Sequence, residues 1–179
     1  QAFITSQVDN VTFKLADAEN LPFEDATFDI VTCRVAPHHF ADLYQFVLES
    51  ARVLKPGGLL IIQDHDAPDD ERDAAYVDAF EKLRDPSHVK AYNETEWRGT
   101  FLDAQLEIEA VRTGLVQPDN FLDWTGRMNV PADDVQRLEV MLAQAPPKAK
   151  AWLDPKGIGT PEGTIVHRYI ILAGRKPSA

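Results

Sequence analysis

A short apolar strand, a polar turn, an amphipathic helix and a second apolar strand follow one another between residues 28 and 66, and this order constrains the fold most. Residues 28–33 (FDIVTC) form the apolar, β-branched run that is typical of a buried parallel strand. From Asp42 the apolar residues recur every three or four positions, which predicts a helix ending at residues 55–58 (KPGG). The run 59–62 (LLII) predicts a second strand. We therefore expect a parallel βαβ unit with a right-handed crossover.

Polar side chains gather where these two strands end. The first strand runs into residues 34–39 (RVAPHH), and the second runs into residues 63–66 (QDHD). Ligands of open parallel sheets bind just outside the carboxyl ends of the strands. The sequence therefore predicts a binding site at this edge.

The segments before and after this unit carry weaker patterns. Residues 11–16 alternate between apolar and polar side chains and are expected to form a first strand, and residues 1–7 are expected to be the last turn of a helix. Pro68 is expected at the first position of a helix. The apolar stripe of that helix would consist of Tyr76, Val77, Phe80 and Leu83.

The second half of the chain is expected to contain two more strands and a helical insertion. Asn93 and Glu96 have the spacing of a capping box, which predicts a helix carrying Trp97, Phe101 and Leu102. Residues 106–110 alternate as a strand with one face in solvent. Residues 117–155 are expected to form a helical cap over the site, and residues 164–173 a closing strand.

Charge and composition exclude several classes of protein. The net charge of −11 argues against binding to nucleic acid or to anionic membranes. No apolar run is long enough for a bilayer span, and no secretory signal pattern opens the chain. Cys33 is the only cysteine, so an internal disulfide is excluded. These features favour a cytoplasmic protein without a nucleic-acid or membrane partner.

Three blocks, in this order, resemble the class I S-adenosylmethionine-dependent methyltransferases, in particular their ubiquinone-biosynthesis-like "type 11" branch. The blocks are residues 17–23 (DAENLPF), 28–40 (FDIVTCRVAPHHF) and 52–58 (RVLKPGG). Residues 85–89 (DPSHV) and 127–130 (RMNV) resemble the cap region of that branch. The resemblance covers essentially the whole chain. It implies a Rossmann-like α/β fold of three layers (α/β/α), S-adenosylmethionine as cofactor, and methyl transfer to a small molecule.

The amino-terminal part of that family has no counterpart here. The family's first strand with its Gly-x-Gly-x-Gly loop, and the acidic residue that ends its second strand, are absent, which corresponds to roughly 60 residues at about 30 per strand-helix unit. In the family's sheet the absent strand lies between strands three and four, so strand three, residues 11–16, would be left unpaired, and strand four, residues 28–33, would have an exposed edge. We therefore expect one partial methyltransferase domain over residues 1–179. It is either the ordered part of a longer protein, which we favour, or a truncated one whose gap a neighbouring copy fills, which leaves a homodimer open.

The resemblance implies a cofactor-binding role for residues at two strand ends: Asp17, Ala18, Glu19, Cys33, Arg34, Val35 and His38. The Asp17 carboxylate could accept a hydrogen bond from the exocyclic amine of adenine, and Ala18 leaves room for a flat ring. The alternative for Asp17 is a carboxylate that caps the next turn. The alternative for Arg34 is a surface ion pair worth under about 1 kcal/mol.

His39 and His88 are the candidate catalytic bases. The unperturbed pKa of histidine lies near 6.5, which suits proton transfer, and His88 could close over the site from the cap. Alternatively, His39 is a buried histidine bonded to backbone, and His88 is favoured by a helix dipole. Methyl transfer is an in-line displacement at a sulfonium carbon that often needs only positioning and desolvation, so a base is not required.

Other kinds of function remain open at this point. A metal site could be built from His38, His39, Asp42, Asp64, His65 and Asp66, but their spacing matches no ligand signature, and we expect no metal. A non-catalytic remnant that serves as a binding or dimerisation module is the main alternative function. A nicotinamide-dependent enzyme would also need the absent glycine loop. Trp124 or Tyr92 could wall an apolar pocket, and a quinone-like acceptor is one hypothesis.

Overall fold

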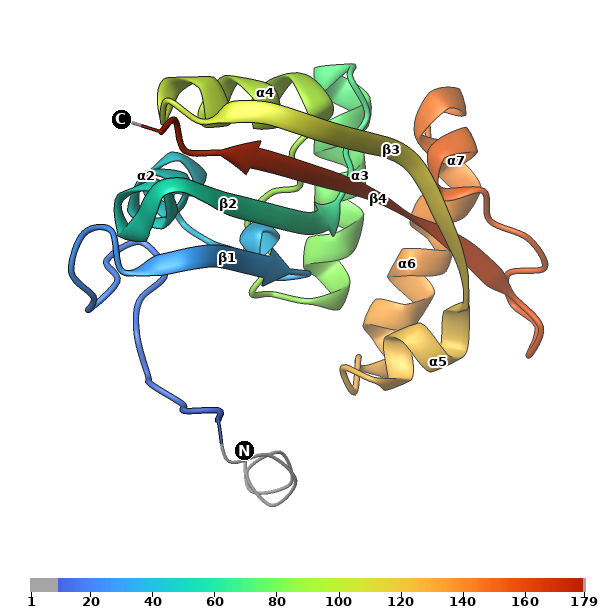
Figure 1. Cartoon of the computed structure of the whole chain (residues 1–179). Helices are drawn as coiled ribbons and strands as arrows, with labels where there is room; N and C mark the ends of the chain where they lie inside the picture. Colours follow the sequence, from blue (N-terminus) through green and yellow to red (C-terminus); the bar gives the residue numbers. More distant parts are fainter. Residues whose placement is uncertain (1–9, 179) are drawn as a thin grey trace.

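The computed structural model describes residues 10–178, in which four strands form one mixed sheet in the order β1-β2-β4-β3 (Figure 1). Strands β1 (Phe28–Arg34) and β2 (Leu54–His65) are parallel. Strand β4 (Thr164–Arg175) lies between β2 and β3 (Glu107–Asn120) and is antiparallel to both. In the described residues, β1 is therefore an edge of the sheet, and Ile30 on it is 57% exposed.

The expected βαβ unit is present. After β1 the chain forms a short 3-10 helix, η1 (Pro37–His39), and then helix α2 (Leu43–Val53). Asp42 caps α2 by accepting a hydrogen bond from the backbone N–H of Gln45. The helix ends at Val53, before the turn at residues 55–58, because β2 begins at Leu54. The buried faces of α2 and of the two strands share one apolar core.

Two helices connect β2 to β3. Helix α3 (Glu71–Arg84) begins three residues after the expected Pro68, because the Asp70 side chain accepts the N–H groups of the first turn and is the N-cap. Helix α4 (Glu94–Asp103) has the predicted capping box, in which Asn93 and Glu96 each accept the backbone N–H of the other.

The helical segment between β3 and β4 begins later than expected. Residues 117–120 were expected to open a helical insertion, but they belong to β3, where Asn120 pairs with Thr164. Helices α5 (Phe121–Gly126), α6 (Ala132–Gln144) and α7 (Pro147–Leu153) follow. None of the helices in residues 10–178 is long and apolar enough to cross a membrane.

Residues 11–16 do not form the expected strand, and all six are exposed. An extended segment becomes a strand only when a neighbour completes its hydrogen-bond ladder, and none lies beside these residues in the described part of the chain. The loop that follows is held by Arg52, which donates to the carbonyl oxygens of Leu21 (3.0 Å) and Phe23 (2.8 Å). Residues 1–7, expected to be helical, lie outside the described residues.

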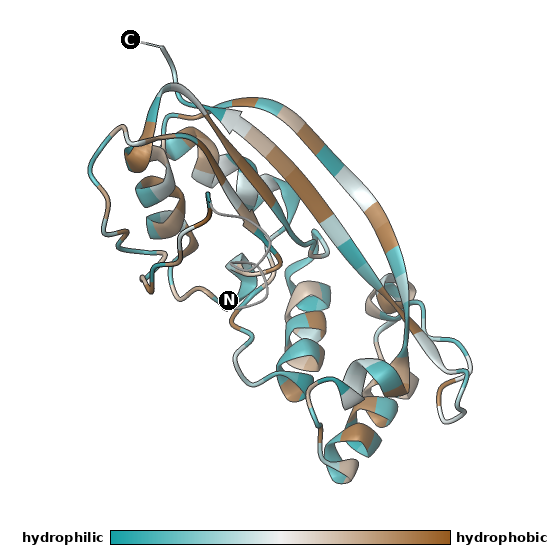
Figure 2. Cartoon of the chain, turned by 60° about the horizontal axis from the view of Figure 1, so that its bottom comes forward, coloured by the Kyte–Doolittle hydropathy of each residue, from teal (hydrophilic) through white to brown (hydrophobic). Residues whose placement is uncertain are grey.

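The described residues contain two apolar clusters. In the sheet core, α2 and α4 pack on one face of the strands, with Leu60 and Ile62 of β2 and Leu172 of β4. In the cap core, α3 packs against α5, α6 and α7, and Val77 and Phe80 of the predicted apolar stripe are buried there. Strand β4 belongs to both clusters, and its middle is strongly apolar (brown in Figure 2).

Candidate active site

A cavity of about 260 Å³ opens where β1 and β2 end. Its wall includes all five histidines of the chain, although they are far apart in the sequence: His38, His39, His65, His88 and His167. Helix α3, the end of β3, helix α5 and the start of β4 complete the wall. The cavity thus lies at the edge of the sheet where the sequence predicts a binding site, and the cap helix α5 covers one side of it.

The histidine rings lie close to one another around His38. The centroid of the His38 ring is 4.0 Å from that of His39, 4.6 Å from that of His65 and 5.5 Å from that of His88. The His65 and His167 centroids are 5.7 Å apart. So many imidazoles cannot all carry a charge at this spacing, because like charges in a poorly hydrated site repel strongly. Burial and the neighbouring histidines lower the pKa of His65 to about 2, which keeps its ring neutral.

His38 forms a buried pair with Asp64. The ring Nδ1 lies 2.6 Å from one Asp64 carboxylate oxygen, and the backbone N–H of His38 donates to the other oxygen at 2.7 Å. Only 5% of His38 and 1% of Asp64 are exposed. A carboxylate that accepts the proton on Nδ1 leaves Nε2 as the basic nitrogen. The pair therefore has the arrangement of an oriented general base.

The two predicted catalytic histidines both line the cavity. His39 is half-buried, and its Nδ1 lies 3.1 Å from the Ser87 hydroxyl, not against the backbone. His88 is buried, and its Nε2 lies 2.8 Å from an Asp78 carboxylate oxygen. Since each ring has a protein partner, both have a defined orientation. Their catalytic role stays a prediction.

Three of the predicted cofactor residues end β1. Val35 lines the cavity and has φ +48°, a left-handed conformation that is costly for a β-branched residue and is typical of functional sites. The Arg34 side chain is exposed and donates a hydrogen bond to Gln63 at 3.2 Å, in place of the alternative ion pair. Burial raises the pKa of the Cys33 thiol to about 11.

Three more predicted cofactor residues lie in the loop before β1 and not in the cavity wall, namely Asp17, Ala18 and Glu19, whereas His38 lines the cavity. Asp17 is exposed, and one of its carboxylate oxygens accepts the backbone N–H of Glu19 at 2.9 Å, so it does cap its own turn. Glu19 accepts the backbone N–H of Asp42 at 3.0 Å and ties the loop to the start of α2. Ala18 and Cys33 both pack against the sheet core.

The six candidate ligands of the alternative metal site do not all come together. Asp42 caps α2, and the Asp66 carboxylate accepts the backbone N–H of Ala67. Both carboxylate oxygens of Asp64 contact His38. The two clusters at the strand ends therefore do not form one set of ligands.

The comparisons with known proteins agree with this architecture. Residues 2–62 match the methyltransferase domain family. The Escherichia coli protein YafE is 34% identical over 152 residues, which cover 85% of this chain and 73% of YafE. A crystal structure from Bacillus halodurans C-125, of a protein proposed to be a methyltransferase, superposes with a TM-score of 0.92 at 32% identity, covering 99% of this chain and 77% of that one. The chain belongs to the methyltransferase domain family.

This methyltransferase domain therefore has the family and the Rossmann-like fold class predicted from the sequence. It is also 39% identical to the uncharacterized methyltransferase YcgJ of Bacillus subtilis over 143 residues, which cover 80% of this chain. The match spans 56% of the length of YcgJ. The described residues contain the sheet and the helices on one of its faces.

The methyltransferase domain contains site residues that the sequence analysis missed. Glu81 of α3 and His167 of β4 are buried in the cavity wall, and burial raises the pKa of Glu81 to about 7. Glu81 follows Val77 by one helical turn, so an acidic residue on the apolar stripe of the predicted helix was the available signal. The cap also supplies Arg127, which forms an ion pair with Asp119 of β3, and both residues line the cavity. The cavity wall therefore contains charged groups, whereas one hypothesis from the sequence was an apolar pocket.

Proposed function

We propose that this domain transfers a methyl group from S-adenosylmethionine to a small polar molecule bound in the histidine-lined cavity. The buried pair of His38 and Asp64 would remove a proton from the acceptor. The observation that carries the proposal is this pair, in which Asp64 lies behind His38 and His38 lines the cavity at the carboxyl ends of two parallel strands.

Membership of the methyltransferase family supports S-adenosylmethionine as the cofactor, and the residues present fit part of it. Among the described residues, the second carboxylate oxygen of the exposed Asp17 has no hydrogen-bond donor and could accept an amine proton, and Ala18 beside it is small. Val35, which directly follows β1 and has a left-handed backbone conformation, comes after this loop in the chain and lines the cavity. When bound, S-adenosylmethionine supplies an electrophilic methyl group on a sulfonium. Cys33, Arg34 and Val35 would hold it at the cavity mouth.

The chemistry assigned to His38 follows from its partner. A hydroxyl or amine acceptor must lose a proton when it gains a methyl group, and His38 Nε2 can take that proton. The Asp64 carboxylate then stabilises the imidazolium that forms. A positioned base of this kind contributes about 10²–10⁴-fold to the rate. His39 and His88 would position the acceptor from either side of His38.

The cavity favours a polar acceptor over the apolar, quinone-like one first considered. Its wall contains the charged groups Arg84, Asp85, Asp119 and Arg127 in addition to the histidines. A volume of about 260 Å³ suits a small metabolite. The net charge of −11 opposes nucleic acid as the substrate.

The test uses the full-length protein. We expect S-adenosylhomocysteine to bind with micromolar affinity in calorimetric titration, and small hydroxyl- or amine-containing acceptors to be methylated. In D64N and H38Q, cofactor binding should persist while turnover falls about 10²–10⁴-fold. The matched control is D66N, since Asp66 directly follows the strand that carries Asp64 and its carboxylate accepts the backbone N–H of Ala67.

Two results would overturn the proposal. Failure of the full-length protein to bind S-adenosylhomocysteine would favour the non-catalytic binding module. Methylation of extracted tRNA or DNA in place of small acceptors would contradict the substrate class.

A further inference from the structure

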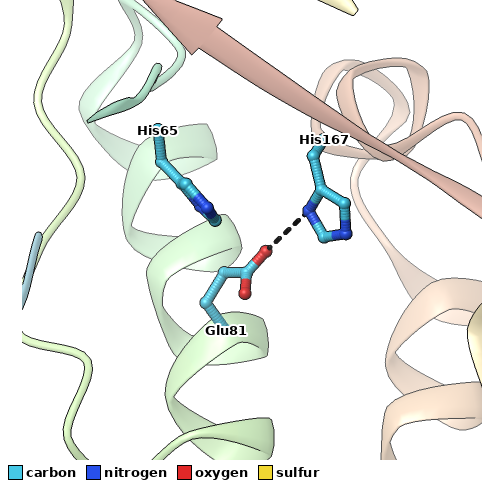
Figure 3. Close-up of side chains that lie close together, drawn as sticks. All are labelled: His65, Glu81 and His167. Atoms are coloured by element: carbon cyan, nitrogen blue, oxygen red, sulfur yellow. Dashed lines mark ion pairs between the residues drawn. The ribbon is translucent and has the colours of Figure 1, made fainter. Parts of the chain in front are cut away.

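Three ligand-type side chains meet on one side of the cavity: the half-buried His65 at the end of β2, and the buried Glu81 on α3 and His167 on β4 (Figure 3). One atom of each can be chosen so that all three lie within 4.8 Å of one another. Glu81 and His167 are each 6% exposed. The three residues come from separate elements, so the fold itself brings them together.

The three side chains point toward a common space without satisfying one another. Oε1 of Glu81 lies 3.7 Å from Nδ1 of His167, which is longer than a hydrogen bond. On this side of the His167 ring, Nδ1 and the Glu81 carboxylate stop short of a hydrogen bond. Buried polar groups in folded proteins normally have a partner, so the space between Glu81, His167 and His65 suits a bound species.

We propose that His65, Glu81 and His167 bind one divalent transition-metal ion. Two imidazole nitrogens and one carboxylate oxygen are a ligand set that suits zinc and related first-row metals. Ligand atoms at about 2.1 Å from an ion lie about 3.0–3.4 Å from one another, so small rotations of these side chains close the site.

The surroundings of His167 match those of a metal-ligating histidine. Its Nδ1 faces Glu81, while its Nε2 lies 3.5 Å from an Asp119 carboxylate oxygen. A histidine that binds a metal through one nitrogen normally directs the N–H of the other to a carboxylate or carbonyl. Asp119 is itself oriented by Arg127. Nδ1 is therefore the ligand nitrogen, and Asp119 supports it.

Three protein ligands leave coordination positions open, and all three ligand residues line the cavity. An acceptor hydroxyl bound there would lose its proton more readily, because a metal ion stabilises the oxyanion. This role in methyl transfer rests on the proposed function. Binding of the ion does not.

The experiment titrates zinc into the metal-free full-length protein by calorimetry, with the visible absorption of bound cobalt as a second readout. We expect one equivalent of zinc to bind, and at least a 100-fold weaker affinity in H167A and in E81Q. D119N should weaken binding about 10–100-fold, since it removes only the supporting carboxylate. H39A is the matched control, because it deletes another histidine of the same cavity and should leave the affinity unchanged.

Each outcome decides the matter. Absence of zinc binding, or binding that E81Q and H167A leave unaltered, would overturn the site. Since Gln keeps the size of Glu, thermal melts of E81Q identify any loss caused by unfolding, and D119N then provides the deciding affinity. Zinc binding without S-adenosylhomocysteine binding would overturn the proposed function alone, and the reverse result would overturn the metal site alone.

Discussion

Cys33 shows how burial changes the chemistry of a single side chain at the end of β1. Its thiol packs against the sheet core, and the main cause of its raised pKa is loss of hydration, with the negative charge of Asp64 adding to it. Since the thiolate is the reactive form, a raised pKa makes this cysteine inert at neutral pH. A cysteine with these surroundings is expected to shape the site and not to act as a nucleophile.

We expect native Cys33 to react with Ellman's reagent at pH 8 about 100-fold more slowly than in the urea-unfolded protein, because its pKa of about 11 lies two units above the ordinary value of 9.0. Between pH 9 and 11 the unfolded chain releases a proton that the folded chain keeps. The free energy of unfolding should therefore fall as the pH rises through this window. Stopped-flow thiol assays and urea titrations measure both effects. In C33A this contribution to the alkaline loss of stability should disappear, and equal native and unfolded reaction rates would contradict the assignment.

The sequence could predict part of the site at the level of single residues. His38 and His39 were found because they directly follow a recognisable strand, and His88 because it lies in a block typical of the family. Glu81 and His167 were missed because the three residues of this cluster are far apart along the chain. Glu81 lies 16 positions after His65, and His167 lies 86 positions after Glu81. No local pattern reports such a separation. Only the pairing of β2 with β4 and the docking of α3 bring these residues together.

At the level of elements, patterns that are complete within one segment were predicted well. The capping box of α4 and the apolar face of α2 depend on residues within one or two turns, so their sequence is sufficient. The strand expected at residues 11–16 was wrong, because an alternating pattern does not provide a neighbour to pair with. The start of the cap was misplaced for a similar reason, since residues 117–120 are strand only through pairing with β4.

The contact between α4 and β4 leads to a prediction for two glycines. A Cβ atom at Gly174 would lie 2.5 Å from Cδ1 of the fully buried Phe101, so G174A should destabilise the protein by about 1–3 kcal/mol through overpacking. A Cβ atom at Gly99 in α4 meets nothing within 4 Å, so G99A should stabilise it by up to about 1 kcal/mol. Urea denaturation of both variants measures the difference. Equal effects of the two substitutions would show that α4 does not pack on β4 in this way.

At the level of the whole molecule, the two apolar clusters divide the fold. The sheet core holds the strands to α2 and α4, and the cap core holds α5, α6 and α7 to α3. The histidine-lined cavity lies between these parts, with wall residues from both. Motions of the cap against the sheet would therefore change the access of solvent to the site.

We expect the two clusters to respond differently to cavity-forming substitutions. L138A in α6 and L172A in β4 each remove a fully buried side chain, at a cost of about 2–5 kcal/mol. Hydrogen exchange should rise in residues 121–153 for L138A while β2 stays protected, whereas L172A should raise exchange throughout the sheet. Uniform loss of protection in both variants would show that the fold opens as a single unit.

The position of β4 also has a consequence for synthesis on the ribosome. Strands β2 and β3 are both made before β4, yet β4 pairs between them. The span from His65 to Arg175 is 110 residues, which takes about 5–20 s at typical elongation rates. During this time the inner edges of β2 and β3 are exposed in the nascent chain, and they are open to pairing with other chains. We therefore expect mispairing of the nascent chain to be most frequent before residue 175 has been translated.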